Sequence, residues 1–163
     1  MIRVLLLLAM SFAARADAQT ADPAPYHAAF DSCLAQPDAD HAACIGDVSA
    51  TCMEAEEGGY STYGMVSCVM MENGLWDEVL NADWPRHRAL AKRQDAAEMP
   101  EFRQADEKLL AAQRAWIAFR DADCAAAAAR WGSGSMRQTA YAGCLLDHTA
   151  QRVLDLRAQW ETF

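Results

Sequence analysis

The side chains in this sequence that can do chemistry are spaced in ways that favour few reactions. The six cysteines include no C-x-x-C pair, so metal binding is a weaker interpretation than disulfide formation. The histidines show neither an H-E-x-x-H motif nor the i, i+4 spacing of a zinc site, and we expect them at the surface. The four histidines are His27, His41, His87 and His148.

Two further polar groups lie in stretches that we expect to be exposed turns. Ser133 and Ser135 alternate with glycines but lack the G-x-S-x-G frame of a hydrolase nucleophile. Glu54, Glu56 and Glu57 precede two glycines and can form a general acid–base pair, a calcium site or a solvated helix end, which we favour. Carboxylates at a helix C-terminus oppose the helix dipole, which indicates that they serve a partner. These five residues are candidate partner contacts, and we expect no catalytic residue, metal or cofactor.

An N-terminal export signal defines the compartment of this protein. Residues 1–18 contain Arg3, a short apolar run and an A-x-A site at 16–18, which are typical of a signal peptide cleaved after Ala18. The apolar run is shorter than the roughly 20 residues that a membrane helix needs, and no later segment is apolar enough. We expect a periplasmic or secreted protein without a membrane span, with a retained N-terminal anchor as the alternative.

The cysteines are interpreted as three disulfides because exported proteins fold in an oxidising compartment. Six cysteines allow many pairings, and the sequence alone does not choose among them. Nearest-neighbour pairing is the simplest arrangement for successive antiparallel helices, and each short loop closure contributes about 2–3 kcal/mol through the unfolded state. The preferred pairs are Cys33–Cys44, Cys52–Cys68 and Cys124–Cys144.

The overall charge restricts the classes of partner. The formal net charge of the chain is −9, so phosphate backbones and anionic membranes repel it, and nucleic acid is not expected as a partner. A cationic protein is favoured electrostatically. The alternative is that negative charge simply keeps an exported protein soluble.

Composition and periodicity indicate an all-α fold. Glycine and proline are few, alanine is abundant, and no stretch alternates apolar and polar residues as a strand does. We expect a small, disulfide-stapled helical bundle in which 19–24 is a linker and 25–163 is a single domain. Two short helices at 25–36 and 41–55 come first, and about three long helices follow.

The long helices show start signals and core stripes. Ser61 or Thr62 can cap the first, which Trp84 and Pro85 should kink or interrupt. Met99 and Pro100 start the second, and the third runs from about Ser135 towards Trp160. The expected stripes are Met65, Val69, Trp76, Val79 and Leu80; then Leu109, Ala112, Trp116 and Phe119; then Tyr141, Leu145, Thr149 or Arg152, and Leu156.

A polar network is expected at the margin of this core. Arg120 follows Phe119 and needs a partner there, because a half-buried charge is costly unless it is paired. We predict that Arg120 pairs with Glu72, while Gln113 and Asn81 complete a network between helices. The alternative is that Arg120 and Glu72 contact a ligand.

Several short motifs occur in the same order as in a known family. They are C-V-M-M-E at 68–72, W-D at 76–77, L-N at 80–81, A-Q-R-x-W-x-x-x-R-D-x-x-C at 112–124, G-S at 132–133, and Cys144 with Thr149 and Arg152. On these motifs, the chain from about Cys52 to its C-terminus resembles the LprI-type lysozyme-inhibitor N-terminal domain family of exported bacterial proteins. It departs from the family at Trp84 and Pro85, near which a Tyr is usual, and in an added segment at 26–50 that would cover surface exposed in other members.

The resemblance implies a binding protein, not an enzyme, that occludes the substrate cleft of lysozyme or another cationic cell-wall hydrolase. The alternative is an interaction or scaffold module of the cell envelope without lysozyme contact, and a cell-wall enzyme with a carboxylate pair ranks below both. The oligomeric state stays open. No catalytic residue carries over, so the motif residues are interpreted as scaffold: Glu72, Trp76, Asp77, Asn81, Gln113, Arg114, Trp116, Arg120 and Asp121.

Overall fold

The structure is a computed structural model that describes residues 20–36 and 41–160. The expected signal peptide at 1–18, the turn at 37–40 and the last residues, 161–163, lie outside the described residues. Five α-helices and two 3₁₀-helices make up the described chain, which contains no strand and confirms the all-α class. They are α1 (His27–Leu34), η1 (His41–Cys44), α2 (Asp47–Ala55), α3 (Thr62–Ala97), η2 (Pro100–Phe102), α4 (Ala105–Ala129) and α5 (Met136–Trp160).

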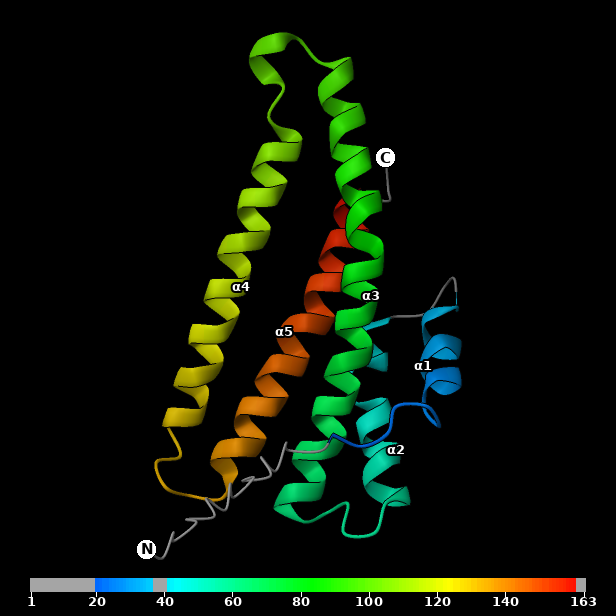
Figure 1. Cartoon of the computed structure of the whole chain (residues 1–163), viewed down its shortest axis with the longest axis vertical. Helices are drawn as coiled ribbons and strands as arrows, with labels where there is room; N and C mark the ends of the chain where they lie inside the picture. Colours follow the sequence, from blue (N-terminus) through cyan, green and yellow to red (C-terminus); the bar gives the residue numbers. More distant parts are fainter. Residues whose placement is uncertain (1–19, 37–40, 161–163) are drawn as a thin grey trace, which may run out of the picture.

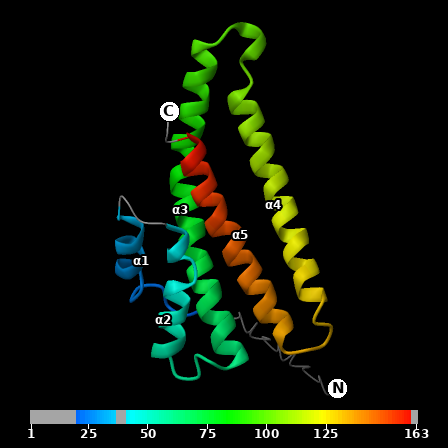
Figure 2. The ribbon, with the colours of Figure 1, turned by 180° about the vertical axis from the view of Figure 1, so that it is seen from behind.

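The three long helices form the body of the molecule. Helix α3 runs the length of this body, and η2 reverses the direction of the chain. Helix α4 then runs back, and α5 packs against both α3 and α4 (Figure 1). Helices α1 and α2 lie on the side of α3 that faces away from α4, as both views show (Figure 2). Among the described residues, no helix combines the length and apolarity needed to cross a membrane.

The core is centred on the middle of α3 and the inner face of α5. Trp76 is fully buried, and the ring of Phe30 from α1 packs edge-on against it at 5.1 Å between centroids. Helix α5 buries Leu145, Thr149 and Leu156 of its expected stripe, whereas Tyr141 is 38% exposed. Burial of such large apolar side chains stabilises the fold by about 1.5–3 kcal/mol each.

Each disulfide joins neighbouring elements. Cys33–Cys44 links α1 to η1, Cys52–Cys68 links α2 to α3, and Cys124–Cys144 links α4 to α5. These are the nearest-neighbour pairs. Together they attach the two short helices to the long ones and hold the end of α4 on α5.

Helix α3 does not restart at Pro85, so the interruption, one of the two expected outcomes, is wrong. It continues as one helix of 36 residues to Ala97. Contacts on both sides of the proline explain this: Asp83 accepts a hydrogen bond of 2.6 Å from Arg157 on α5, and Arg88 pairs with Asp106 on α4. Packing therefore sustains the helix although Pro85 removes one backbone donor.

The expected stripe on α4 is only partly correct. Leu109 is buried and Trp116 is partly buried, but Ala112 is exposed and Phe119 is 57% exposed. The disulfide to α5 turns Cys124 inward, and Phe119, five residues earlier, then points about 140° away around the helix. Covalent attachment at Cys124 thus sets the inward face of α4.

The start of α4 also differs from the prediction. Pro100 begins the short η2, and α4 itself begins at Ala105. The Asp95 carboxylate on α3 accepts hydrogen bonds from the backbone N–H groups of Ala105 (2.7 Å) and Asp106 (3.1 Å). A carboxylate favours a helix N-terminus because it satisfies free donors and the helix dipole, so α3 positions the first turn of α4.

Candidate binding surface

The predicted partner contacts lie in two loops at the same end of the molecule. Glu54, Glu56 and Glu57 are exposed at the end of α2 and in the α2–α3 loop. Ser133 and Ser135 are exposed in the α4–α5 loop. Both loops lie at the end of the bundle opposite η2 (Figure 1). The structure thus brings the two candidate loops to one end.

The α2–α3 loop is held in a defined conformation. Gly58 has φ +72°, a left-handed backbone that favours glycine, and a Cβ at Gly59 would clash with the backbone carbonyl of Met53. The Ser61 hydroxyl accepts a hydrogen bond of 3.0 Å from the Gly64 N–H and caps α3, as expected. The carboxylates of this loop are therefore presented on a constrained backbone.

Glu56 is occupied within the molecule. The buried Tyr26 hydroxyl donates a hydrogen bond of 3.0 Å to its carboxylate. Burial raises the pKa of Tyr26, and the hydrogen bond to Glu56 raises it further. Glu54 and Glu57 are thus better placed than Glu56 to meet a partner.

A groove lies at this end, where the first turns of α3 and α5 meet the last turns of α4. Its volume is about 660 Å³. Small alanine side chains from the run at 125–129 leave this space open, which is the signal that sequence reasoning missed. The groove is lined by Thr20, Tyr63, Val66, Ser67, Met70, Ala125, Ala128, Arg137, Gln138, Tyr141 and Ala142.

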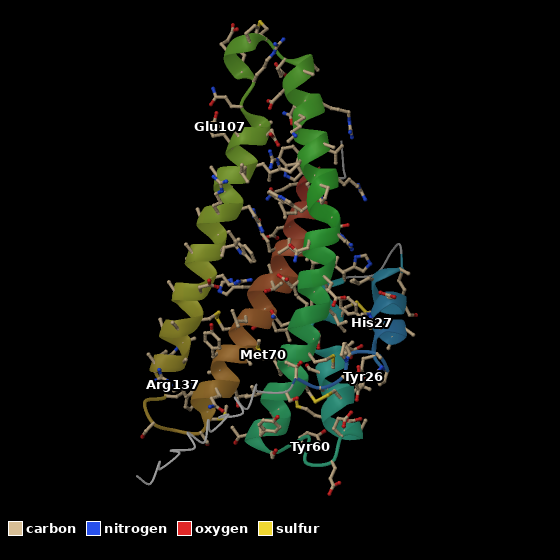
Figure 3. The ribbon with its side chains drawn as sticks, viewed as in Figure 1. Tyr26, His27, Tyr60, Met70, Glu107 and Arg137 are labelled. Atoms are coloured by element: carbon tan, nitrogen blue, oxygen red, sulfur yellow. A yellow bond between two sulfur atoms is a disulfide. The ribbon has the colours of Figure 1, made fainter. Side chains whose placement is uncertain are left out.

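Exposed aromatic and methionine side chains lie on the segments that form this end: the start of α3, the α4–α5 loop and the start of α5. Tyr60 is 67% exposed and Tyr63 is 62% exposed at the start of α3. Figure 3 places Tyr60, Met70 and Arg137 towards this end of the molecule, and Glu107 towards the opposite one. The others are Trp131, Met136 and Tyr141. Aromatic side chains of this kind anchor protein interfaces because they bury large areas at low entropic cost.

Glu72 does not pair with Arg120, contrary to our prediction. Its fully buried carboxylate accepts hydrogen bonds from the backbone N–H groups of Gly46 and Ser49, both at 2.7 Å, and from Trp76 Nε1 at 3.2 Å. It therefore caps the N-terminus of α2, whose own N-cap residue, Gly46, has no side chain to do so. The glutamate points towards α2 and not towards α4.

Arg120 instead lies over the indole ring of Trp116, with the guanidinium carbon 5.0 Å from the ring centroid. It pairs with Asp121 at 2.9 Å. Arg152 from α5 lies 5.6 Å from the same ring and donates a hydrogen bond of 2.9 Å to Gln113, so Gln113 does join α4 to α5. Burial lowers the pKa of Arg152.

The remaining motif residues contribute little to the contact between helices. Asn81 donates to the carboxylate and the backbone carbonyl of Asp77 on its own helix, so it does not join the expected network between helices. Arg114 is exposed. Asp77 and Asn81 therefore make contacts along α3, and the motif G-S at 132–133 lies in the α4–α5 loop.

The histidines differ in their surroundings. His87 is fully buried on α3, so its expected surface position is wrong; it lies with Ala91 on a face that packing covers. His148 Nε2–H donates a hydrogen bond of 2.9 Å to the Asp123 carboxylate, and the His148 ring stands edge-on to Phe119 at 5.4 Å. Phe119 therefore packs on α5 from the margin of α4.

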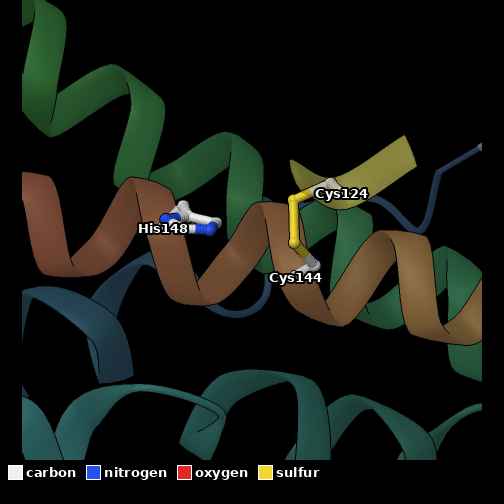
Figure 4. A group of neighbouring side chains, drawn as sticks. All are labelled: Cys124, Cys144 and His148. Carbon is white, nitrogen blue, oxygen red and sulfur yellow. A yellow bond between two sulfur atoms is a disulfide. The ribbon is translucent and has the colours of Figure 1, made fainter. Parts of the chain in front are cut away.

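One group of potential metal ligands comes together in the described part of the chain. Cys124, Cys144 and His148 place their ligand atoms within 4.8 Å of one another (Figure 4). Both sulfurs belong to a disulfide, and metal coordination by cysteine requires the thiolate. In the oxidised protein this group offers a metal a single histidine.

Comparison with known proteins identifies one family. The family model described as "Lysozyme inhibitor LprI" matches residues 52–156, which extends from the α2–α3 disulfide almost to the end of α5. No curated protein and no solved structure matches the chain.

Proposed function

The chain belongs to the LprI family of lysozyme inhibitors, and on this premise we propose that it binds a cationic cell-wall hydrolase and blocks its substrate cleft. The observation that carries the proposal is the shared position of carboxylates and exposed aromatic residues at one end of the bundle. Glu54 and Glu57 lie there together with Tyr60 and Tyr63. Protein interfaces commonly combine such aromatic anchors with complementary charge.

Electrostatics supports a cationic partner. The formal net charge of −9 attracts a basic protein and accelerates its association, more strongly at low salt. The two loops are candidate contacts because both are exposed at this end. Glu54, Glu57, Ser133 and Ser135 would make the polar contacts, and Glu56 would hold its loop through Tyr26.

The proposed mechanism is occlusion without bond making or breaking. A surface that is already ordered loses little conformational entropy when it binds, which favours affinity. Cys52–Cys68 and Cys124–Cys144 each hold an element that borders the surface. Disulfides of this kind suit an exported protein that works in the periplasm or outside the cell.

Lysis of cell walls by a cationic c-type lysozyme tests the proposal. We expect the oxidised protein, residues 19–163, to inhibit lysis at near-stoichiometric concentration and to lose potency from low to moderate salt, because ions screen the attraction. The matched control is the same protein after reduction and iodoacetamide alkylation, which keeps its charge but removes its disulfides. It should inhibit much less.

The absence of inhibition across several lysozyme types would overturn the proposal. In that case an interaction module of the cell envelope without lysozyme contact becomes the better explanation. Turnover of peptidoglycan by the protein alone would contradict both functions and point to an enzyme.

A further inference from the structure

The groove at the loop end has the size and chemistry of a site for one or two protein side chains. Its volume of about 660 Å³ falls within the range of roughly 300–1,000 Å³ that binding clefts occupy. Val66 and Met70 from α3 and Ala128 and Ala142 from the facing helices supply apolar walls. An apolar side chain that enters such a groove removes apolar surface of both partners from water, which favours binding.

Tyr63 connects the groove to the acidic loop. It lines the groove from the first turn of α3, and 62% of its surface is exposed. Glu57 precedes it by a few residues in the constrained α2–α3 loop. The loop backbone beside Glu57 lies close to the backbone beside Tyr63, because Gly58 packs against Gly64, so a partner on Tyr63 also comes near this loop.

The positive charge at the groove lies on the side of the α4–α5 loop. Arg137 is the cationic residue among those lining the groove, and its guanidinium donates a hydrogen bond of 3.2 Å to the carbonyl of Gly132 in the α4–α5 loop. The acidic side chains lie at the opposite loop, between α2 and α3. This asymmetry favours basic groups of a partner on the α2–α3 side of the groove.

We infer that the groove is the anchor site of the interface: it takes an aromatic or aliphatic side chain of a cationic partner protein, whose flanking Lys or Arg residues pair with Glu54 and Glu57. The inference rests on the proposed function and adds the position and orientation of the contact. Complementary charge selects this occupant, because Glu54 and Glu57 are exposed at the α2–α3 loop of the same end and the chain as a whole carries −9.

Paired aromatic variants at opposite ends of the molecule test the inference. Tyr63→Ala removes a side chain that lines the groove. Phe102→Ala removes an aromatic side chain of similar exposure at η2: Tyr63 is 62% exposed and Phe102 is 60% exposed. Gln138→Trp fills the groove from its exposed rim without removing a contact in the core. The probe is a purified cationic c-type lysozyme, its dissociation constant is measured by calorimetry, and circular dichroism checks the fold of each variant.

We expect Tyr63→Ala and Gln138→Trp each to weaken lysozyme binding about tenfold or more, as loss of an interface anchor does, with Phe102→Ala within about twofold of the unmodified protein. Unchanged binding by both groove variants, with the unmodified protein still inhibiting, overturns this inference alone. No binding by the unmodified protein overturns the proposed function and the inference together. Sedimentation of the protein alone measures self-association. If the protein self-associates and Tyr63→Ala abolishes this, the groove binds a second copy and the inference is overturned.

Discussion

Glu72 carries a carboxylate with no exposed surface, and two backbone N–H groups and one indole N–H donate to it. Removing a carboxylate from water is costly, and hydrogen bonds from three donors offset that cost. The donors belong to α3 itself and to the start of α2. This one side chain therefore joins the segment before Cys52 to the long helices.

Replacement of Glu72 by alanine should destabilise the protein strongly. We expect Glu72→Ala to lower the free energy of unfolding by about 2–4 kcal/mol, because it leaves buried donors without an acceptor and removes the cap of α2. Urea denaturation followed by circular dichroism measures the change. Glu78→Ala, at an exposed position of the same helix, is the control and should change stability by less than about 0.5 kcal/mol. Similar losses for both variants would contradict the capping role.

At the scale of elements, α3 organises its neighbours through its acidic side chains. Glu72 caps α2 and Asp95 caps α4, and in both cases the side chain of the capped helix's own N-cap residue makes no capping hydrogen bond. Asp83 also pairs with Arg157 of α5, and Arg88 of α3 pairs with Asp106 of α4, so ion pairs tie α3 to both neighbours. The pKa of Asp106 is lowered mainly by its hydrogen bond from Arg88. Helix α3 therefore tolerates Pro85, because its neighbours hold both of its halves.

Pro85→Ala should stabilise α3. Pro85 is exposed, so its replacement disturbs no core contact and restores an N–H donor for the Asn81 carbonyl. We expect the free energy of unfolding to rise by about 1–3 kcal/mol, measured by thermal and urea unfolding. Ala89→Gly, also exposed on α3, is the control and should lower it by about 0.5–1 kcal/mol. A loss of stability in Pro85→Ala would show that the proline supports a bend which the packing requires.

At the scale of the whole molecule, the family motifs meet the proposed binding surface at two points, Met70 in the groove and Ser133 in the α4–α5 loop. Phe30, Gly46 and Ser49, which precede the matched residues 52–156, contact Trp76 and Glu72. The 36 residues of α3 span about 54 Å, so its two ends lie several Debye lengths apart at 0.1 M salt. Charges at one end therefore act locally on a bound partner.

Because the two ends lie far apart, two double variants that change the net charge equally can test which end attracts the partner. Glu54→Gln with Glu57→Gln should slow association with a cationic c-type lysozyme and flatten its salt dependence, since these carboxylates adjoin the proposed contact. Glu101→Gln with Glu107→Gln alters the same number of exposed charges near the η2 end and should have a smaller effect. Association rates at two salt concentrations give the comparison. Equal effects of both pairs would mean that overall charge, and not this surface, attracts the partner.

Much of the fold follows from local features of the sequence. Helical spacing, the Ser61 cap and short cysteine intervals between consecutive helices act within a few turns of chain, and they predicted the helices and the pairs now seen as disulfides. The two exposed loops were predictable for the same reason, because glycine-rich stretches between helices turn at the surface. Order and spacing of motifs likewise predicted the family that matches 52–156.

The partners of Glu72 and Arg120, the exposure of Phe119 and the groove beside Tyr63 depended on tertiary structure. Each is set by how far one helix is rotated and offset against another, and a change of one residue in the inward face turns a side chain by about 100°. Local spacing leaves that rotation undetermined. The Cys124–Cys144 bond and the packing of α5 against α3 and α4 decide it, because they choose the face that α4 buries and the space that its alanines leave open.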